Sequence, residues 1–211
     1  MNQDLRLILI CAISLCLICC TKSNSQKSLE GLFESYKSEL VSSAKFTKYA
    51  LAARSDGLDT LSHLLVAIAQ SDSIHAANHA KVLEKFGKDH ETYEKADIAV
   101  KATPENLKLV LKEKSFVMQS AYPGFIKRAE QEKIPQVATT LSWAYNVEKK
   151  QLQYLRMAST IISKGNEKKI PLVWLICPTC GDIYSLQDLK GKCEFCLTAQ
   201  ENFMGYKSPA E

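Results

Sequence analysis

Glycine, proline and dense basic clusters are scarce in this chain of 211 residues. It contains 8 glycines, 6 prolines and no low-complexity run, which excludes collagen-like repeats and extended disorder. The 27 basic and 23 acidic residues leave a formal net charge of +4, without a dense patch of Lys or Arg. We therefore expect no nucleic-acid partner. The length allows one large domain, or a medium domain with a small satellite.

Cysteine is absent from the 156 residues between Cys20 and Cys177. The eight cysteines form two groups at the ends of the chain: Cys11, Cys16, Cys19 and Cys20, and then Cys177, Cys180, Cys193 and Cys196. A disulfide framework would spread its cysteines along the chain. The two groups therefore have separate, local roles.

The first group belongs to a predicted export signal. Arg6 precedes an apolar run over residues 7–20, which is too short to span a hydrocarbon core of about 30 Å but suits a signal peptide. The run ends on Leu17-Ile18-Cys19-Cys20, which is similar to the cleavage box of bacterial lipoproteins, with Cys20 as the lipidated residue. An ordinary secretory signal or an uncleaved anchor would be the alternatives.

This pattern predicts a signal peptide over residues 1–19 and a flexible tether over residues 20–28. The mature protein would be a membrane protein of the bacterial cell envelope, facing outside the cytoplasm. A lipidated cysteine carrying several acyl chains would anchor it stably.

From residue 28 to residue 163 the apolar residues recur at intervals of three and four, as in amphipathic helices. Four helices are predicted, over residues 29–54, 59–86, 103–121 and 135–164. We expect Thr103 to cap the third helix and Pro123 to kink or break it. Two short links and one long one between these helices indicate a bundle over residues 29–165.

The inward stripes of these helices contain polar residues. They are Asp72, His75 and His79 on the second helix, Lys114 on the third, and Glu148 and Gln151 on the fourth. Burying such a group without a partner costs several kcal/mol, so each must be paired or bound. Their similar levels on three helices predict one shared site.

Three segments resemble the rubrerythrin family. They are Ser71-Asp72-Ser73-Ile74-His75-Ala76-Ala77-Asn78-His79, then Asn106-Leu107-Lys108 with Ala121-Tyr122-Pro123-Gly124-Phe125, and Trp143-Ala144 followed by Glu148. The resemblance implies a mainly α fold, in which a ferritin-like four-helix bundle precedes a small β domain of the rubredoxin-like or zinc-ribbon kind. It also implies two irons that reduce peroxide, an iron centre in the tail that feeds them electrons, and a homodimer.

The resemblance carries the family's iron ligands onto seven positions: Ser42, Asp72, His75, Lys114, Val117, Glu148 and Gln151. Only Asp72, His75 and Glu148 keep ligand chemistry, which is too little for two irons. The ammonium of Lys114 could instead close a polar network without metal. The alternative is one ion held by those three residues, with His79 or Glu39. No catalytic residue is assigned, and whether the chain is an enzyme stays open.

The second cysteine group predicts a metal site in residues 166–211. Cys177-Pro178-Thr179-Cys180 and Cys193-Glu194-Phe195-Cys196 form two Cys-x-x-Cys hairpins whose thiolates can converge tetrahedrally. We expect Trp174, Tyr184 and Phe203 to surround the site. Two disulfides are the alternative. Four thiolates hold either iron or zinc; the resemblance favours iron, whereas Leu197, at a position where the family usually has glycine, leaves zinc open.

Three functions are compatible with these patterns. The first is a lipid-anchored electron carrier with an iron held by the four C-terminal cysteines, a redox partner and a link to peroxide defence, in which the bundle has lost its dinuclear iron site. The second is a non-enzymatic scaffold that binds a partner and contains a structural zinc ribbon. The third is a peroxidase with a single metal ion in the bundle. The redox activity of the tail and the metal content of the bundle distinguish them.

Overall fold

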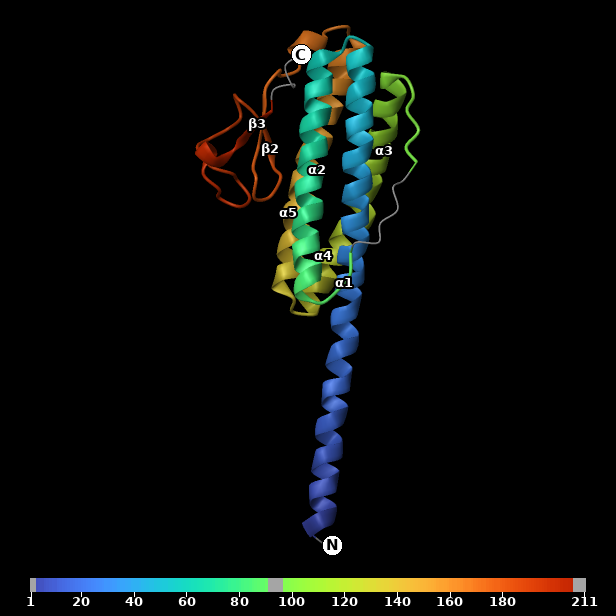
Figure 1. The fold of residues 1–211 in the computed structure, drawn as a ribbon, viewed down its shortest axis with the longest axis vertical. Coiled ribbons are helices and arrows are strands. Elements are labelled where there is room, and N and C mark those ends of the chain that lie inside the picture. Colours follow the sequence, from blue (N-terminus) through green and yellow to red (C-terminus); the bar gives the residue numbers. More distant parts are fainter. Residues whose placement is uncertain (1–2, 91–96, 207–211) are drawn as a thin grey trace.

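The structure, a computed structural model, describes residues 3–90 and 97–206, with the backbone alone for residues 3–26 and 206. Its helices are α1 (Gln3–Ser55), α2 (Asp59–Lys85), α3 (Thr103–Ser120), α4 (Tyr122–Gln131) and α5 (Pro135–Ser163). They form a four-helix bundle in which α2 and α3 run in the same direction, since α3 begins beside the end of α1, and the N-terminal part of α1 extends beyond the bundle (Figure 1). The predicted bundle is confirmed, with α3 and α4 together occupying the third position.

The predicted break at Pro123 is confirmed. Ala121 separates α3 from α4, and Pro123 lies in the first turn of α4, where its missing N–H leaves no hydrogen bond unmade. The predicted cap of α3 is wrong by one residue. Ala102 is the capping residue, with extended backbone (ψ 145°), and Thr103 is already helical. The hydroxyl of Thr103 instead donates to Asp56 Oδ2, at 2.6 Å, which ties α3 to the end of α1.

Two apolar clusters fill the bundle, and a polar layer separates them. On α2, Ile68 belongs to the first cluster and Leu83 to the second. On α5, Leu155 belongs to the first and Leu141 to the second. The buried polar residues lie between these positions along both helices. Those that the sequence predicts are Asp72, His75 and His79 on α2, and Glu148 and Gln151 on α5; Ser71 of α2 is buried beside them. The apolar clusters on either side therefore hold the helices around one polar layer.

The tail is a small antiparallel sheet with the strand order β2-β1-β3. The strands are β1 (Trp174–Ile176), β2 (Ile183–Ser185) and β3 (Met204–Tyr206), with short helices η1 (Glu167–Lys169) and η2 (Gln200–Asn202). The sheet lies beside α2 and α5 (Figure 1). The prediction that Trp174 lies around the cysteines is wrong. Trp174 packs edge-on against Tyr154 of α5 and joins the core of the bundle, because β1 faces α2.

The predicted signal peptide, Cys20 and most of the tether lie where no side chains are described. The backbone of α1 is helical there. Among the residues whose side chains the structure describes, no helix is long and apolar enough to cross a membrane. The lipid anchor stays a prediction.

Candidate metal centres

The four C-terminal cysteines converge as predicted. Their sulfur atoms all lie within 4.8 Å of one another. Cys177 Sγ is 3.4 Å from Cys196 Sγ, and Cys180 Sγ is 3.4 Å from Cys193 Sγ. These separations exceed the bond of about 2.05 Å in a disulfide, and all four cysteines are free. They approach the spacing of about 3.8 Å between sulfurs that each lie 2.3 Å from a tetrahedral ion.

Two similar turns position these sulfurs. The amide of Gly181 donates to the carbonyl of Cys177 at 2.9 Å, and the amide of Leu197 donates to that of Cys193 at 3.1 Å. Both residues have left-handed backbone, with φ of 81° and 64°. Glycine adopts this conformation freely, whereas a leucine pays about 1–2 kcal/mol for it. The departure from glycine at Leu197 therefore keeps the turn and adds strain.

The first cysteine turn rests directly on α2. Ser71 Oγ donates to the carbonyl of Gly181 at 2.5 Å, and Asn78 Nδ2 donates to the carbonyl of Thr179 at 2.7 Å. A Cβ atom on Gly181 would lie 2.9 Å from the ring of His75. Glycine is therefore required here for close approach as well as for backbone conformation. The cysteine cluster and the polar layer of the same chain meet at His75.

Lys150 of α5 holds the other side of the tail. Its ammonium lies 3.1 Å from Asp182 Oδ1, 2.9 Å from Glu194 Oε1 and 3.4 Å from the centre of the Tyr184 ring. Burial raises the pKa of Asp182 to about 6, although the charge of Lys150 lowers it. Trp143 of α5, Phe195 and Phe203 pack against the cysteines and limit their contact with water.

In the bundle, Lys114 lies at the centre of the polar layer. Its ammonium donates to both carboxylate oxygens of Glu148, at 2.6 and 2.5 Å, and to Gln151 Oε1 at 2.6 Å. It also lies 3.7 Å from Asp72 Oδ2. Burial lowers the pKa of Lys114, but the surrounding carboxylates outweigh it and raise the pKa above the ordinary value. Lys114 and Glu148 therefore form a buried ion pair.

Asp72 is held by neutral donors from two other helices. Gln151 Nε2 donates to Asp72 Oδ1 at 2.8 Å and to Ser71 Oγ at 2.9 Å. Ser42 Oγ of α1 donates to Asp72 Oδ2 at 2.6 Å. Ser42, expected at a ligand position, thus acts as a hydrogen-bond donor to a ligand. Val117, expected beside Lys114, packs against the apolar cluster at the α4 end of the bundle.

Glu39 of α1 forms the remaining corner of the layer, one turn before Ser42. Tyr122 donates its hydroxyl proton to Glu39 Oε1. Burial and the charge of Glu39 raise the pKa of Tyr122, so the hydroxyl keeps that proton. Glu39 Oε2 faces His75 Nδ1 at 3.4 Å. Burial lowers the pKa of His75, but the Glu39, Asp72 and Glu148 carboxylates outweigh it and raise the pKa overall.

Four of these groups form a possible ion site. Ligand atoms of Glu39, Asp72, His75 and Glu148 all lie within 4.8 Å of one another, and all four residues are buried. His79 is not part of this set, and its Nδ1 lies 2.9 Å from the hydroxyl of Thr140. Burial lowers the pKa of His79 to about 3, so it stays neutral. Of the two residues considered as a fourth ligand, Glu39 is the one placed with the others.

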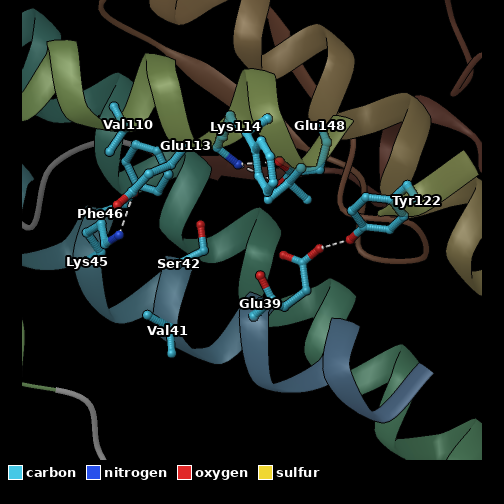
Figure 2. A pocket seen from close by; sticks show the side chains of 13 residues that line it. Glu39, Val41, Ser42, Lys45, Phe46, Val110, Glu113, Lys114, Tyr122 and Glu148 are labelled. Atoms are coloured by element: carbon cyan, nitrogen blue, oxygen red, sulfur yellow. Dashed lines mark hydrogen bonds and ion pairs between the residues drawn. The ribbon is translucent and has the colours of Figure 1, made fainter. Parts of the chain in front are cut away.

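A cavity of about 340 Å³ leads to this layer between α1 and α3. Glu39 and Ser42 lie on one side of it, and Lys114 with Glu148 on the other (Figure 2). Its walls are largely apolar, with Lys45 and Glu113 paired at 2.5 Å among them. The polar layer is therefore accessible to small solutes.

The sequence model of the rubrerythrin family matches residues 30–158, which is more than half of the chain. The chain belongs to the rubrerythrin family. Rubrerythrin of Clostridium perfringens is 26% identical to it over 189 residues, covering 86% of this chain and 95% of the relative. Nigerythrin of Nitratidesulfovibrio vulgaris is 28% identical over 193 residues, covering 88% and 90%.

Solved structures show the same fold for this rubrerythrin-family chain. Nigerythrin in a mixed-valence state superposes with a TM-score of 0.74 at 24% identity, covering 85% of this chain and 86% of that one. The bacterioferritin of Desulfovibrio desulfuricans, which has a diiron site, superposes with a TM-score of 0.64 at 16% identity, covering 71% and 88%. The ferritin-like bundle followed by a rubredoxin-like cysteine domain is thus confirmed.

Proposed function

We propose that this chain is an iron-binding redox protein that carries single electrons through the site of Cys177, Cys180, Cys193 and Cys196. Membership of the rubrerythrin family supports iron and redox chemistry. The observation that carries the proposal is the convergence of four free thiols within 4.8 Å, in a tail that rests on the polar layer of the bundle. An iron held by four thiolates changes between the ferrous and ferric states and so exchanges one electron.

The protein's own residues control access to that electron. Trp143, Phe195 and Phe203 cover the cysteines, which keeps the site in a medium of low polarity. Cys196 is only partly buried, and the neighbouring Leu197 is 63% exposed. This edge is where we place contact with a redox partner. On the opposite side, Gly181 touches His75, which connects the cysteine site to the bundle.

The residues of the bundle do not fit a dinuclear iron site. Lys114 places a fixed positive charge between Glu148, Gln151 and Asp72, three of the expected ligands. Its ammonium donates to both oxygens of Glu148 and so lies where a second ion would have to bind. We therefore propose that the dinuclear site is degenerate, and we derive no reaction step from it.

The number of electrons that peroxide reduction needs supports a role for this chain as an electron supplier. Reduction of one hydrogen peroxide to two waters consumes two electrons and two protons, whereas one iron held by four cysteines releases one electron at a time. Without a dinuclear partner in the bundle, the chain would supply electrons to a separate peroxide-reducing protein. We propose this role in the cell envelope, with Cys20 as the lipid anchor.

The first test is the metal content and absorption spectrum of the purified full-length chain, expressed with iron and zinc both available. One iron per chain with the red thiolate-to-iron absorption bands, bleached by a one-electron reductant, is expected. One zinc and no colour would refute electron transfer and support the scaffold with a zinc ribbon. Hydrogen peroxide turnover by the purified chain alone would refute the role of supplier.

The envelope location has its own test. The wild-type chain should sediment with the membrane fraction of a bacterial host, and Cys20→Ala should release it or leave it unprocessed. A wild-type chain that stays in the cytoplasm would refute this part of the proposal. The homodimer stays a prediction, to be checked by analytical ultracentrifugation in detergent.

A further inference from the structure

Several buried ligand atoms in the polar layer lack hydrogen bonds, and His75 Nε2 and His79 Nε2 are among them. Glu39 Oε2 and His75 Nδ1 make none with any described residue, although Glu39 is only 3% exposed and His75 1%. The two atoms face each other at 3.4 Å. Leaving such groups unsatisfied costs about 1–3 kcal/mol each, and more when charged, so native proteins usually pair them or bind an ion there.

We infer that the bundle binds one divalent transition-metal ion between Glu39, Asp72, His75 and Glu148, and that the ammonium of Lys114 replaces a second ion. This inference is independent of electron transfer by the tail. It differs from the dinuclear site of the family in two respects. Glu39, rather than the residue at position 42, supplies the ligand from α1, and a lysine supplies part of the positive charge.

The separations agree with one ion. Two ligand atoms that each lie about 2.1 Å from a metal at tetrahedral angles are about 3.4 Å apart, which is the distance between Glu39 Oε2 and His75 Nδ1. Asp72 Oδ1 lies 4.0 Å from the same nitrogen. Each oxygen of Asp72 accepts one hydrogen bond from Ser42 or Gln151 and keeps a lone pair, as a metal-binding carboxylate needs.

The charges also agree with one ion. Glu39, Asp72 and Glu148 bring three negative charges when ionised, and Lys114 brings one positive charge. Two negative charges remain, and one divalent cation neutralises them with His75 in the neutral form that binds metals. A second divalent ion would leave an excess positive charge in a buried layer, which is unfavourable. Lys114 therefore limits the site to one ion.

The ligand set and the access route indicate the class of ion. Three carboxylates with one imidazole suit manganese, iron or zinc, whereas calcium and magnesium prefer oxygen ligands alone. The cavity between α1 and α3 reaches Glu39 and Glu148 directly (Figure 2), so an ion can enter without unfolding the bundle.

Manganese(II) is the probe of choice, because it prefers oxygen and nitrogen ligands and leaves a filled four-thiolate site alone. The full-length chain with its cysteine site loaded is titrated with manganese(II) chloride, and bound ion is counted by electron paramagnetic resonance. We expect one manganese ion per chain, with a spectrum that shows magnetic coupling between the manganese and a nitrogen of one imidazole. Glu39→Gln and His75→Gln should each weaken binding by at least about 100-fold.

Two matched controls lie close by. Glu113→Gln removes a carboxylate from the same cavity, and His79→Gln removes a buried histidine one turn from His75; neither should change binding. The double variant Lys114→Glu with Val117→Glu should bind two ions per chain. Circular dichroism verifies that each variant is folded, and the nitrogen coupling is measured on the wild type without any substitution.

Several results would overturn the inference. They are no bound manganese in the folded wild type, two ions in the wild type, equal loss in Glu113→Gln, or a spectrum without nitrogen coupling. A single ion in the double variant would overturn the role of Lys114. None of these outcomes affects the colour or reduction of the cysteine site, so failure here is distinguishable from failure of the proposed electron transfer.

Discussion

Replacing Lys114 by methionine tests whether its charge holds the polar layer together in the absence of a bundle metal. Met has a similar length but offers no donor to Glu148, whose two oxygens accept at 2.6 and 2.5 Å, or to Gln151. Removing one member of a buried ion pair costs about 3–5 kcal/mol, because the other charge stays buried. For a domain of this size that corresponds to a fall in melting temperature of about 10 °C.

The measurement is thermal unfolding followed by circular dichroism, after dialysis against EDTA and with the metal of the cysteine site checked. Lys45→Met is the control, since the Lys45–Glu113 pair is partly exposed and should contribute less than about 1 kcal/mol. The double variant Lys114→Met with Glu148→Leu should recover most of the lost stability, because removing one charge of each sign returns the net charge of the layer to that of the wild type. The reasoning is refuted if Lys114→Met is no worse than Lys45→Met, or if the double variant is no more stable than the single one.

Three further predictions concern the tail and the pH response. Gly181→Ala places a methyl group 2.9 Å from the ring of His75 and from the carbonyl of Ser71, so the tail should move away from α2. Hydrogen–deuterium exchange of the strand amides in the tail should then be faster, and unchanged exchange would contradict the contact. Leu197→Gly relieves left-handed strain at φ 64° and should stabilise the tail by about 1 kcal/mol, seen as slower metal release, whereas faster release would contradict it. Burial lowers the pKa of His79 from 6.5 to about 3, so between these pH values the unfolded chain binds a proton that the folded chain does not. The free energy of unfolding should therefore fall by up to about 5 kcal/mol as the pH is lowered from 6.5 to 3. Urea midpoints against pH should show this loss, and His79→Gln should flatten it.

Regular spacing and proline chemistry were enough to predict the helices. The periodicity around Asp72 and His75 placed these residues inward, and they are buried between two apolar clusters. Pro123 marked the break between α3 and α4. The two Cys-x-x-Cys pairs predicted the cysteine site because four thiolates at such spacing converge on an ion. These features depend on short-range geometry, which sequence determines strongly.

Glu39 was harder to place, because the resemblance aligns the family's ligand with Ser42, one turn later. Both residues point into the layer, as helical neighbours at i and i+3 do. The buried series Leu32, Ser35, Glu39, Phe46 and Tyr49 in α1 was the available signal, since its spacing of three, four and seven places Glu39 inward. The sequence could not show which of the two residues reaches His75.

Contacts between distant segments could not be predicted from local patterns. Trp174 was expected around the cysteines because it lies three residues before Cys177, yet it packs on Tyr154 of α5. The approach of Gly181 to His75 joins residues more than one hundred positions apart. Such contacts depend on how the sheet docks on the bundle, and nothing in the spacing of either segment specifies that docking.

The residues that replace the family's iron ligands in the bundle change the charge of the polar layer in a way that agrees with one bound ion. The resemblance places five carboxylates around two irons, whereas this chain keeps Asp72 and Glu148, adds Glu39, and inserts the positive charge of Lys114. The layer therefore loses about three units of negative charge, close to the charge of one ferrous or ferric ion. A site that had simply decayed would have no reason to hold Glu39 Oε2 and His75 Nδ1 facing each other without hydrogen bonds. The charge difference and these two free ligand atoms both favour one remaining ion, next to a tail that handles one electron at a time.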